Sequence, residues 1–263
     1  MNCANCSCFM KFLKITLLST HLLCACIPAH YVYTPLVVSD IEKKGDYSVS
    51  GTFSTSPETK NFNLNGHYGI ANQWILQASI TNRDDYLKAY EYDTKGYSFD
   101  VALGYTNIST VKNFYVESFI GYGSGSLNNS GIENTVNYAK FGYNKIFSQF
   151  NFNYKLNSTV EDLNTLSFHF PIRIAYVHFN EISYNSTGGG FGTRQIETLI
   201  DDPREWKISI GKIISYRFKD VKLSLSASYH STTNAVELFT FGNIFIGGGI
   251  SWRNFFITKT NNQ

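Results

Sequence analysis

Residues 221–229 read Val-Lys-Leu-Ser-Leu-Ser-Ala-Ser-Tyr, with apolar side chains at every second position. Successive side chains of a β-strand point to opposite faces of the sheet, so this period of two predicts a strand with one apolar face. The same alternation recurs along residues 47–54, 62–70, 74–81, 97–105, 114–122, 138–154, 166–176, 206–218 and 238–252. We therefore predict an all-β chain of about ten strands, within a range of eight to twelve. Only residues 84–92 could form a short helix.

The composition fits one barrel-sized β domain. The chain has 263 residues, of which 16% are aromatic and 16% are charged, and its formal net charge is +2. This balance excludes an acidic disordered chain and gives no support for nucleic-acid binding. No apolar stretch of about 18 residues occurs after position 30, so we expect no helical membrane span in the body of the chain.

The first 26 residues have the features of a secretion signal. A basic start at Met10 is followed by an apolar stretch that ends in Leu23-Cys24-Ala25-Cys26. These four residues resemble the bacterial lipobox, in which the last Cys receives lipid and becomes the first residue of the mature chain. The resemblance implies a covalent lipid on Cys26 and no other cofactor. Cleavage just after Cys26 by an ordinary signal peptidase is the alternative.

This interpretation gives a domain organisation. Residues 1–25 form the signal peptide, with translation starting at Met1 or Met10, and residues 26–45 form a lipidated periplasmic linker. Residues 46–257 form the β domain, and residues 258–263 form a tail. Cys26 would be the single cysteine of the mature chain, so we expect neither a disulfide framework nor a metal site.

Three features indicate which face of the sheet is buried. Many alternating runs reach 10 residues, the length that a tilted membrane strand needs. Their polar face carries Ser, Asn, Gly and Thr instead of the Lys and Glu that cover most soluble sheets. Tyr and Trp recur at the strand ends, as they do at membrane interfaces. We therefore predict a closed antiparallel transmembrane β-barrel whose apolar face points outward.

The expected connections alternate in length. Residues 82–95, 123–134 and 183–202 would form long loops, separated by shorter turns, which predicts long extracellular loops and a periplasmic N-terminus. With the signal and the strands, this pattern resembles small outer-membrane β-barrel proteins of Gram-negative bacteria, over residues 10 to about 257. The resemblance implies an outer-membrane location, with membrane lipids and the barrel assembly machinery as partners.

Strand parity predicts which polar side chains enter the lumen. A ten-stranded barrel has an interior largely filled by side chains, and opposite charges there should pair. We expect a hydrogen-bonded polar network, with a narrow conduit or ligand cavity as the alternative. The parity changes near Phe147-Ser148 and near Lys212, which predicts a bulge or early turn at the first position. The charged and imidazole side chains expected inside are Asp100, Glu117, Arg173, Lys207, Lys222, His67 and His169.

Three functions fit these expectations. The first is a non-enzymatic structural or surface-binding protein that acts through its long extracellular loops. The second is an outer-rim hydrolase or lipid-modifying enzyme. The third is a soluble, lipid-anchored periplasmic β-sandwich or lipocalin-like binder, whose apolar face would be a core.

The enzyme hypothesis depends on a few side chains near the expected outer rim. Asp84-Asp85, Asp201-Asp202 and His230 could combine as the acidic pair and His–Asp pair do in barrel proteases of the omptin family. Ser167 or Ser228 with His169 or His230 would be a serine hydrolase pair. The glycine-rich residues 186–192 are expected to form a flexible loop with no helix after them, which argues against nucleotide binding.

Overall fold

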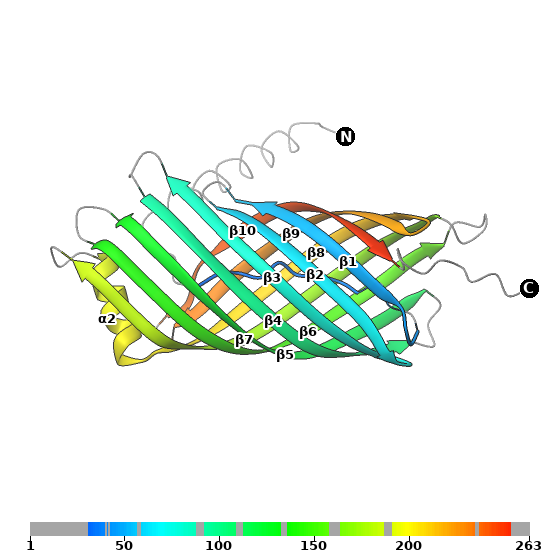
Figure 1. The fold of residues 1–263 in the computed structure, drawn as a ribbon, viewed down its shortest axis with the longest axis horizontal. Helices are drawn as coiled ribbons and strands as arrows, with labels where there is room; N and C mark the ends of the chain where they lie inside the picture. Colours follow the sequence, from blue (N-terminus) through cyan, green and yellow to red (C-terminus); the bar gives the residue numbers. More distant parts are fainter. Residues whose placement is uncertain are drawn as a thin grey trace, which may run out of the picture.

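The chain forms a closed antiparallel barrel of ten strands (Figure 1). This computed structural model describes residues 31–39, 41, 43–56, 59–87, 92–108, 113–132, 136–157, 164–186, 191–234 and 237–253. The strands are β1 (Tyr47–Thr55), β2 (Lys60–Ala71), β3 (Trp74–Leu87), β4 (Tyr92–Ile108), β5 (Phe114–Ile132), β6 (Val136–Asn157), β7 (Asn164–Ser186), β8 (Arg204–Phe218), β9 (Val221–Asn234) and β10 (Glu237–Arg253). One helix, α2 (Phe191–Asp201), connects β7 to β8. Among the described residues, no helix is long and apolar enough to cross a bilayer.

Each strand pairs with its neighbours in sequence, and β1 pairs with β10 to close the barrel. The prediction of an all-β closed antiparallel barrel of ten strands is thereby confirmed. A β-sandwich is excluded, because a sandwich consists of two separate packed sheets.

The apolar side chains point outward and the polar ones inward. Leu225 is 71% exposed and Ile246 is 66% exposed on the outer surface, while Asn63, Gln149 and their luminal neighbours are buried. A soluble barrel such as a lipocalin would place its apolar face in the core. The observed arrangement is the reverse, as in transmembrane barrels.

Three predicted loops are largely strand, which corrects the expected loop lengths. β3 continues to Leu87 and β4 begins at Tyr92, β5 continues to Ile132, and β7 continues to Ser186. The expected short helix over residues 84–92 is also wrong, because Asp84–Leu87 belong to β3. α2 follows the glycine-rich segment, where we expected no helix. Strands β5, β6 and β7 extend beyond the rest with 19, 22 and 23 residues.

The predicted irregularity at Phe147-Ser148 is absent. Phe147 pairs with Ala175 and Ser148 with Ile174 in continuous register, and the nearest irregularity lies between Gly142 and Tyr143. The hydrophobic parity changes there because aromatic side chains enter the lumen. Near Lys212 the strand is also continuous: Lys212 points outward, with its Nζ 5.9 Å from the centre of the Phe170 ring.

The barrel has two unlike ends, which we name by their connections. The α2 mouth carries α2 and the long strands of β5–β7. The turn mouth carries the short turns at residues 72–73 and 219–220. Aromatic side chains face outward near both mouths: Tyr97, Tyr122, Tyr176 and Trp206 toward the α2 mouth, and Tyr68, Trp74, Tyr105, Tyr154, Tyr216 and Trp252 toward the turn mouth.

Candidate functional site: the lumen and its N-terminal segment

A segment of the chain itself occupies the lumen. Residues 31–39 and 41, named here the luminal segment, run inside the barrel from the α2 half toward the turn mouth before β1 begins (Figure 1). Most of its described side chains are buried, including Tyr31, Val32, Thr34 and Leu36. We expected these residues to form part of a periplasmic linker, but they fill the inside of the barrel instead.

Arg83 on β3 fixes the N-terminal end of the luminal segment. Its Nη1 donates to the Tyr31 carbonyl at 3.0 Å, and its Nη2 donates to Thr59 Oγ1 at 3.2 Å. Asp85, two residues along the same face, pairs with Arg83 at 2.6 Å and balances its charge. Thr59 precedes β2 at the α2 mouth, so one guanidinium group ties Tyr31 to the rim.

Tyr31 lies close to two cations of the barrel wall. The Nζ atoms of Lys145 and Lys207 are 5.3 and 5.5 Å from the centre of its ring, a distance at which cations and aromatic rings attract. Tyr143 contributes a hydroxyl that accepts from the Val32 amide at 3.3 Å.

A three-member ion network holds the middle of the segment. Lys145 Nζ is 2.8 Å from Asp100 Oδ1, and Arg173 Nη1 is 3.4 Å from Asp100 Oδ2. Lys145 also donates to Thr34 Oγ1 at 2.8 Å, and Arg173 Nε donates to Gln149 Oε1 at 2.8 Å. The network therefore links β4, β6 and β7 to the luminal segment.

Side chains of β5 and β6 hold the next part. Gln149 and Asn151 both donate to the Val37 carbonyl, at 2.8 and 3.3 Å. Glu117 accepts hydrogen bonds from Ser39 Oγ and, at 2.9 Å, from Asn151 Nδ2. Backbone groups of the segment are thus satisfied by wall side chains, as burial of an extended chain requires.

The segment leaves the lumen against β2 at the turn mouth. The amides of Gly45 and Gly69 donate to the carbonyls of Gly69 and Asp46, each at 2.8 Å. A Cβ on Gly69 would lie 2.3 Å from the Lys43 carbonyl oxygen, so only glycine allows this approach. Arg253 at the end of β10 pairs with Asp46 at 2.9 Å.

Apolar side chains fill the lumen near the α2 mouth. α2 buries Ile196 and Leu199 in the same cluster as the start of the luminal segment, so the helix covers this end of the lumen. We name this group the cap cluster; it comprises Tyr31, Val32, Leu127, Phe141, Tyr143, Phe147, Val177, Phe179, Ile196 and Leu199.

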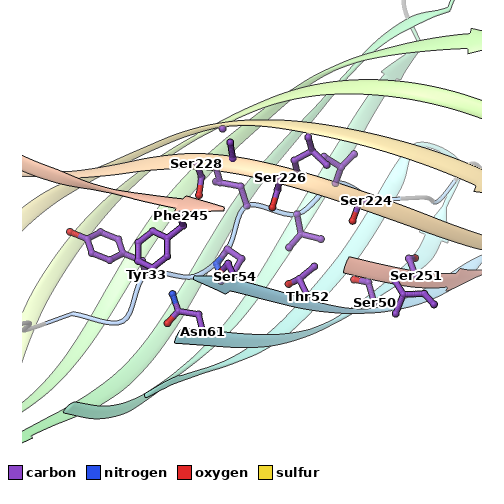
Figure 2. A pocket seen from close by; sticks show the side chains of 18 of the residues that line it. Tyr33, Ser50, Thr52, Ser54, Asn61, Ser224, Ser226, Ser228, Phe245 and Ser251 are labelled. Atoms are coloured by element: carbon purple, nitrogen blue, oxygen red, sulfur yellow. The ribbon is translucent and has the colours of Figure 1, made fainter. Parts of the chain in front are cut away.

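A narrow cavity remains on the opposite side of the luminal segment (Figure 2). Its volume is about 40 Å³, which is room for a few water molecules. Tyr33 and residues 35–38 of the segment form one wall, and the facing wall carries the hydroxyl groups of Ser50, Thr52, Ser54, Ser224, Ser226, Ser228 and Ser251.

Several buried polar atoms beside this cavity lack a protein partner within the described residues. They include Ser50 Oγ, Thr52 Oγ1 and Asn61 Oδ1 at the cavity, and Asn65 Oδ1, Ser79 Oγ and both amide atoms of Gln77 farther along β2 and β3. Buried polar atoms are normally hydrogen-bonded, so water is their natural partner. The cavity and the unpartnered atoms named here lie toward β9, β10 and β1–β3, so we expect water on this side of the luminal segment.

The structure places all seven luminal residues named from the sequence inside the barrel. Asp100 and Arg173 come together, and Glu117 contacts the luminal segment. Lys207 pairs with Glu205 on its own strand, while Lys222 lines the cavity. Sequence reasoning placed Asp85 at the outer rim and missed the other polar anchors of the lumen, which are Arg83, Lys145, Gln149, Asn151 and Glu205. Strand parity continued through residues 145–153 would have found three of them.

Hydroxyl and amide groups are among the partners of the luminal histidines. His67 Nδ1 is 3.4 Å from Ser48 Oγ. His169 is hydrogen-bonded to Asn153 Oδ1 at 2.7 Å and to Ser215 Oγ at 2.9 Å. Its hydroxyl partner is Ser215, whereas Ser228, one of the two serines named in the hydrolase hypothesis, lies beside His230.

The residues proposed for a rim enzyme are not assembled as a site. His230 is buried in the lumen, where the hydroxyls of Ser209 and Ser228 are its partners, at 2.7 and 2.9 Å. Asp85 pairs with Arg83, and Asp202 pairs with the exposed Arg204. Asp84 and Asp201 are exposed. Among the described residues, no group of three His, Cys, Asp or Glu side chains could hold a metal ion. Cys26 lies outside the described residues.

Comparison with known proteins finds similarity only at the level of three-dimensional shape. No protein-family model matches the chain, and no curated protein matches its sequence. The β domain of the Bordetella autotransporter Brka superimposes with a TM-score of 0.41 and 8% identity, over 79% of this chain and 98% of that one. The N-terminal barrel domain of Pseudomonas aeruginosa OprF superimposes with a TM-score of 0.33 and 6% identity, over 80% of this chain and 98% of that one. The attachment invasion locus protein Ail of Yersinia pestis superimposes with a TM-score of 0.32 and 11% identity, over 80% of this chain and 99% of that one. At these TM-scores, the fold assignment rests on the strand pairing of this chain and on nothing in its neighbours.

Proposed function

We propose that this chain is a non-enzymatic outer-membrane β-barrel whose lumen is closed by its own N-terminal segment. Its role is structural or surface-binding, through the parts of the barrel at the α2 mouth. The observation that carries the proposal is the luminal segment, which is bonded to the barrel wall along its length and leaves a cavity of only about 40 Å³.

The outer surface supports membrane insertion. Phe62, Ile120 and Leu225, among many others, expose apolar side chains between the two sets of outward aromatic residues. In water such a continuous apolar belt would cause association, whereas in a bilayer it is solvated by lipid. Membrane lipids are thus the first partner, and the barrel assembly machinery that inserts such proteins is the second.

The unlike mouths support one orientation. Exposed ion pairs such as Lys140–Glu181 and Arg204–Asp202 lie at the α2 mouth, on the parts that extend beyond the aromatic residues. Charged groups there require water, and transmembrane barrels carry their short turns on the periplasmic side. We therefore place the α2 mouth outside the cell and the turn mouth in the periplasm.

Two measurements on the intact protein test this function. Membranes from cells that make the protein are extracted with alkali, and the retained protein is run on gels with and without heating. A membrane barrel resists extraction and changes its mobility on heating. The purified protein is then inserted into planar lipid bilayers, where it should show no stepwise ion conductance. Release by alkali would refute membrane insertion, and open-channel steps would refute the closed lumen.

A further inference from the structure

One lysine faces outward in the middle of the apolar belt. Lys212 lies on the outer face of β8, between the exposed side chains of Ile210 and Ile214. Ala227 of β9 is paired with it on one side. On the other side lies the ring of Phe170 on β7, with its centre 5.9 Å from Lys212 Nζ. A charged side chain on the lipid face of a barrel is costly, so Lys212 needs a polar partner there.

The barrel itself supplies no carboxylate for Lys212. Within the described strands, the outward-facing Asp and Glu side chains lie beyond the aromatic residues toward the α2 mouth, as Asp84 and Glu181 do. The outward cations Lys95 and Arg204 lie there as well, each paired with an aspartate. A second copy of this chain would bring the same surface, so its described strands would offer no carboxylate at the depth of Lys212 either.

Lys212 lies nearer the turn mouth than the α2 mouth. It is four residues from Tyr216 and six from Trp206, the outward aromatic residues near the two edges of the belt on β8. At about 3.4 Å per residue and a strand tilt near 40°, these separations correspond to roughly 10 and 16 Å along the barrel axis. An extended lysine side chain spans about 6 Å, and small local thinning of the leaflet closes the remaining gap. The interface at the turn mouth is therefore the one within reach.

Pro171 interrupts the strand pairing beside Lys212. The paired residues of β7 and β8 stop at His169 and resume at Ile172, and Pro171 lies within this gap. Proline has no N–H, so β7 donates one hydrogen bond fewer to β8 at this point. A backbone carbonyl without a donor is costly among lipid tails, so the gap favours a nearby polar group. The lysine and the gap thus favour a polar headgroup at the same place.

We propose that Lys212 binds the phosphate group of an anionic phospholipid in the leaflet at the turn mouth, with its ammonium beside the Phe170 ring. The inference rests on the proposed function for the presence of the membrane. A phosphate oxygen meets the charge of the ammonium and accepts its hydrogen bonds. The small side chain of Ala227 leaves room for acyl chains on the adjoining strand. Phosphatidylglycerol fits better than phosphatidylcholine, because the positive choline group offsets the charge of the phosphate.

Lipid binding by the purified barrel tests the inference. The protein in a neutral detergent is titrated with phosphatidylglycerol or with phosphatidylcholine, and the affinity for the first bound lipid is measured by native mass spectrometry. One lysine near a membrane surface strengthens the binding of anionic lipid by about fivefold. We therefore expect Lys212→Met to lower the preference for phosphatidylglycerol by about fivefold, and Lys212→Arg to retain it.

The matched control is Lys95→Met. Lys95 also points outward, but it lies beyond the aromatic residues and pairs with Asp93, so its loss should leave the lipid preference unchanged. The inference is overturned if the unaltered and Lys212→Met proteins prefer phosphatidylglycerol equally. It is also overturned if Lys212→Met retains the lipid preference and instead dissociates a complex isolated from the membrane, because the partner of Lys212 is then a protein carboxylate.

Two double variants test the depth of the site in lipid vesicles. Lys212→Ile with Ile214→Lys moves the lysine two residues toward the turn mouth, and Lys212→Ile with Ile210→Lys moves it two residues away. The measurement is the shift in the urea midpoint of unfolding that phosphatidylglycerol causes in phosphatidylcholine vesicles. The first double variant should keep the shift of the unaltered protein and the second should lose it, whereas equal shifts would refute the argument from depth.

One further comparison separates this inference from the proposed function. All proteins are first tested for resistance to alkaline extraction and for the mobility shift on heating. Release of the unaltered protein by alkali would refute membrane insertion, and the lipid site with it. A barrel that stays in the membrane but shows no preference for phosphatidylglycerol at Lys212 overturns the lipid site alone.

Discussion

An arginine in the middle of the outer belt distinguishes a membrane barrel from a water-soluble one. Leu225 is 71% exposed on β9, four residues from Val221 and four from Tyr229, which are near the two edges of the belt. Four residues of tilted strand correspond to about 10 Å along the axis, which places Leu225 near the bilayer midplane.

The magnitude of the effect differs strongly between the two environments. On the surface of a soluble protein, a Leu→Arg change at such an exposed site costs within about 0.5 kcal/mol. At the midplane of a bilayer, an arginine on the lipid face of a barrel costs about 2–4 kcal/mol. We therefore expect Leu225→Arg to lower the free energy of unfolding by about 2–4 kcal/mol in lipid vesicles.

The assay is equilibrium unfolding by urea in vesicles, followed by tryptophan fluorescence. The matched control is Asn128→Arg on β5, an exposed outward position six residues beyond the aromatic Tyr122 toward the α2 mouth, where the side chain meets water. This control should unfold like the unaltered protein. A Leu225→Arg protein that also unfolds within 0.5 kcal/mol of the unaltered protein would refute the membrane-facing assignment of the belt.

Three further predictions concern the lumen. Asp100→Asn removes the counter-charge of the buried Lys145 and Arg173 and should lower the free energy of unfolding by about 3–5 kcal/mol in the same assay. The control is Asp93→Asn, whose partner Lys95 is exposed. A loss below about 1 kcal/mol for Asp100→Asn would show that the ion network contributes little to stability. Gly69→Ala forces a Cβ to within 2.3 Å of the Lys43 carbonyl oxygen and should lower the free energy of unfolding by about 1–3 kcal/mol. Gly66→Ala on the same strand meets no atom within 4 Å and should leave the stability unchanged. Equal midpoints of urea unfolding for the two variants would contradict the close approach at Gly69. Deletion of residues 31–39 should give stepwise ion conductance in planar bilayers, because the wall would then enclose a water-filled lumen; a silent deletion protein that retains the mobility shift would show that side chains of the wall close the lumen without the segment.

Much of the barrel was predictable because strand alternation is a local property. The alternation from Val221 to Tyr229 predicts both a strand and which side chains lie on each of its faces. In the same way, parity placed Asp100 and Arg173 inside, where they form an ion pair. Contacts between distant residues were not needed to place these side chains, because every strand of the closed sheet has the same alternation of an outward and a luminal face.

The rest depends on contacts between residues distant in sequence. The luminal segment bonds Lys145 and Gln149, which are 111 and 112 residues away from their partners Thr34 and Val37, and nothing local distinguishes such a segment from a linker. The false irregularity at Phe147 has a related cause, because its ring is buried in the luminal cluster, with the Arg173 guanidinium 4.5 Å from the ring centre, and does not face lipid. The loop predictions failed because polar strands that extend into water lose the alternation that marks a membrane strand.

The threaded segment also constrains the order in which the barrel can form. β1 and β10 meet along a seam that pairs Ser48–Thr55 with Ile246–Arg253, and the luminal segment is continuous with β1. A finished barrel offers only two narrow mouths, so a segment that is bonded to the wall at several positions is not easily drawn into it afterwards. We therefore expect the wall to close around its own leading segment, with the ion pair between Asp46 and Arg253 linking the start of β1 to the end of β10. Partner proteins that assist this closure would meet an open, curved sheet that already holds the luminal segment, and an inhibitor that displaced the segment at this stage would leave a barrel with an unfilled lumen.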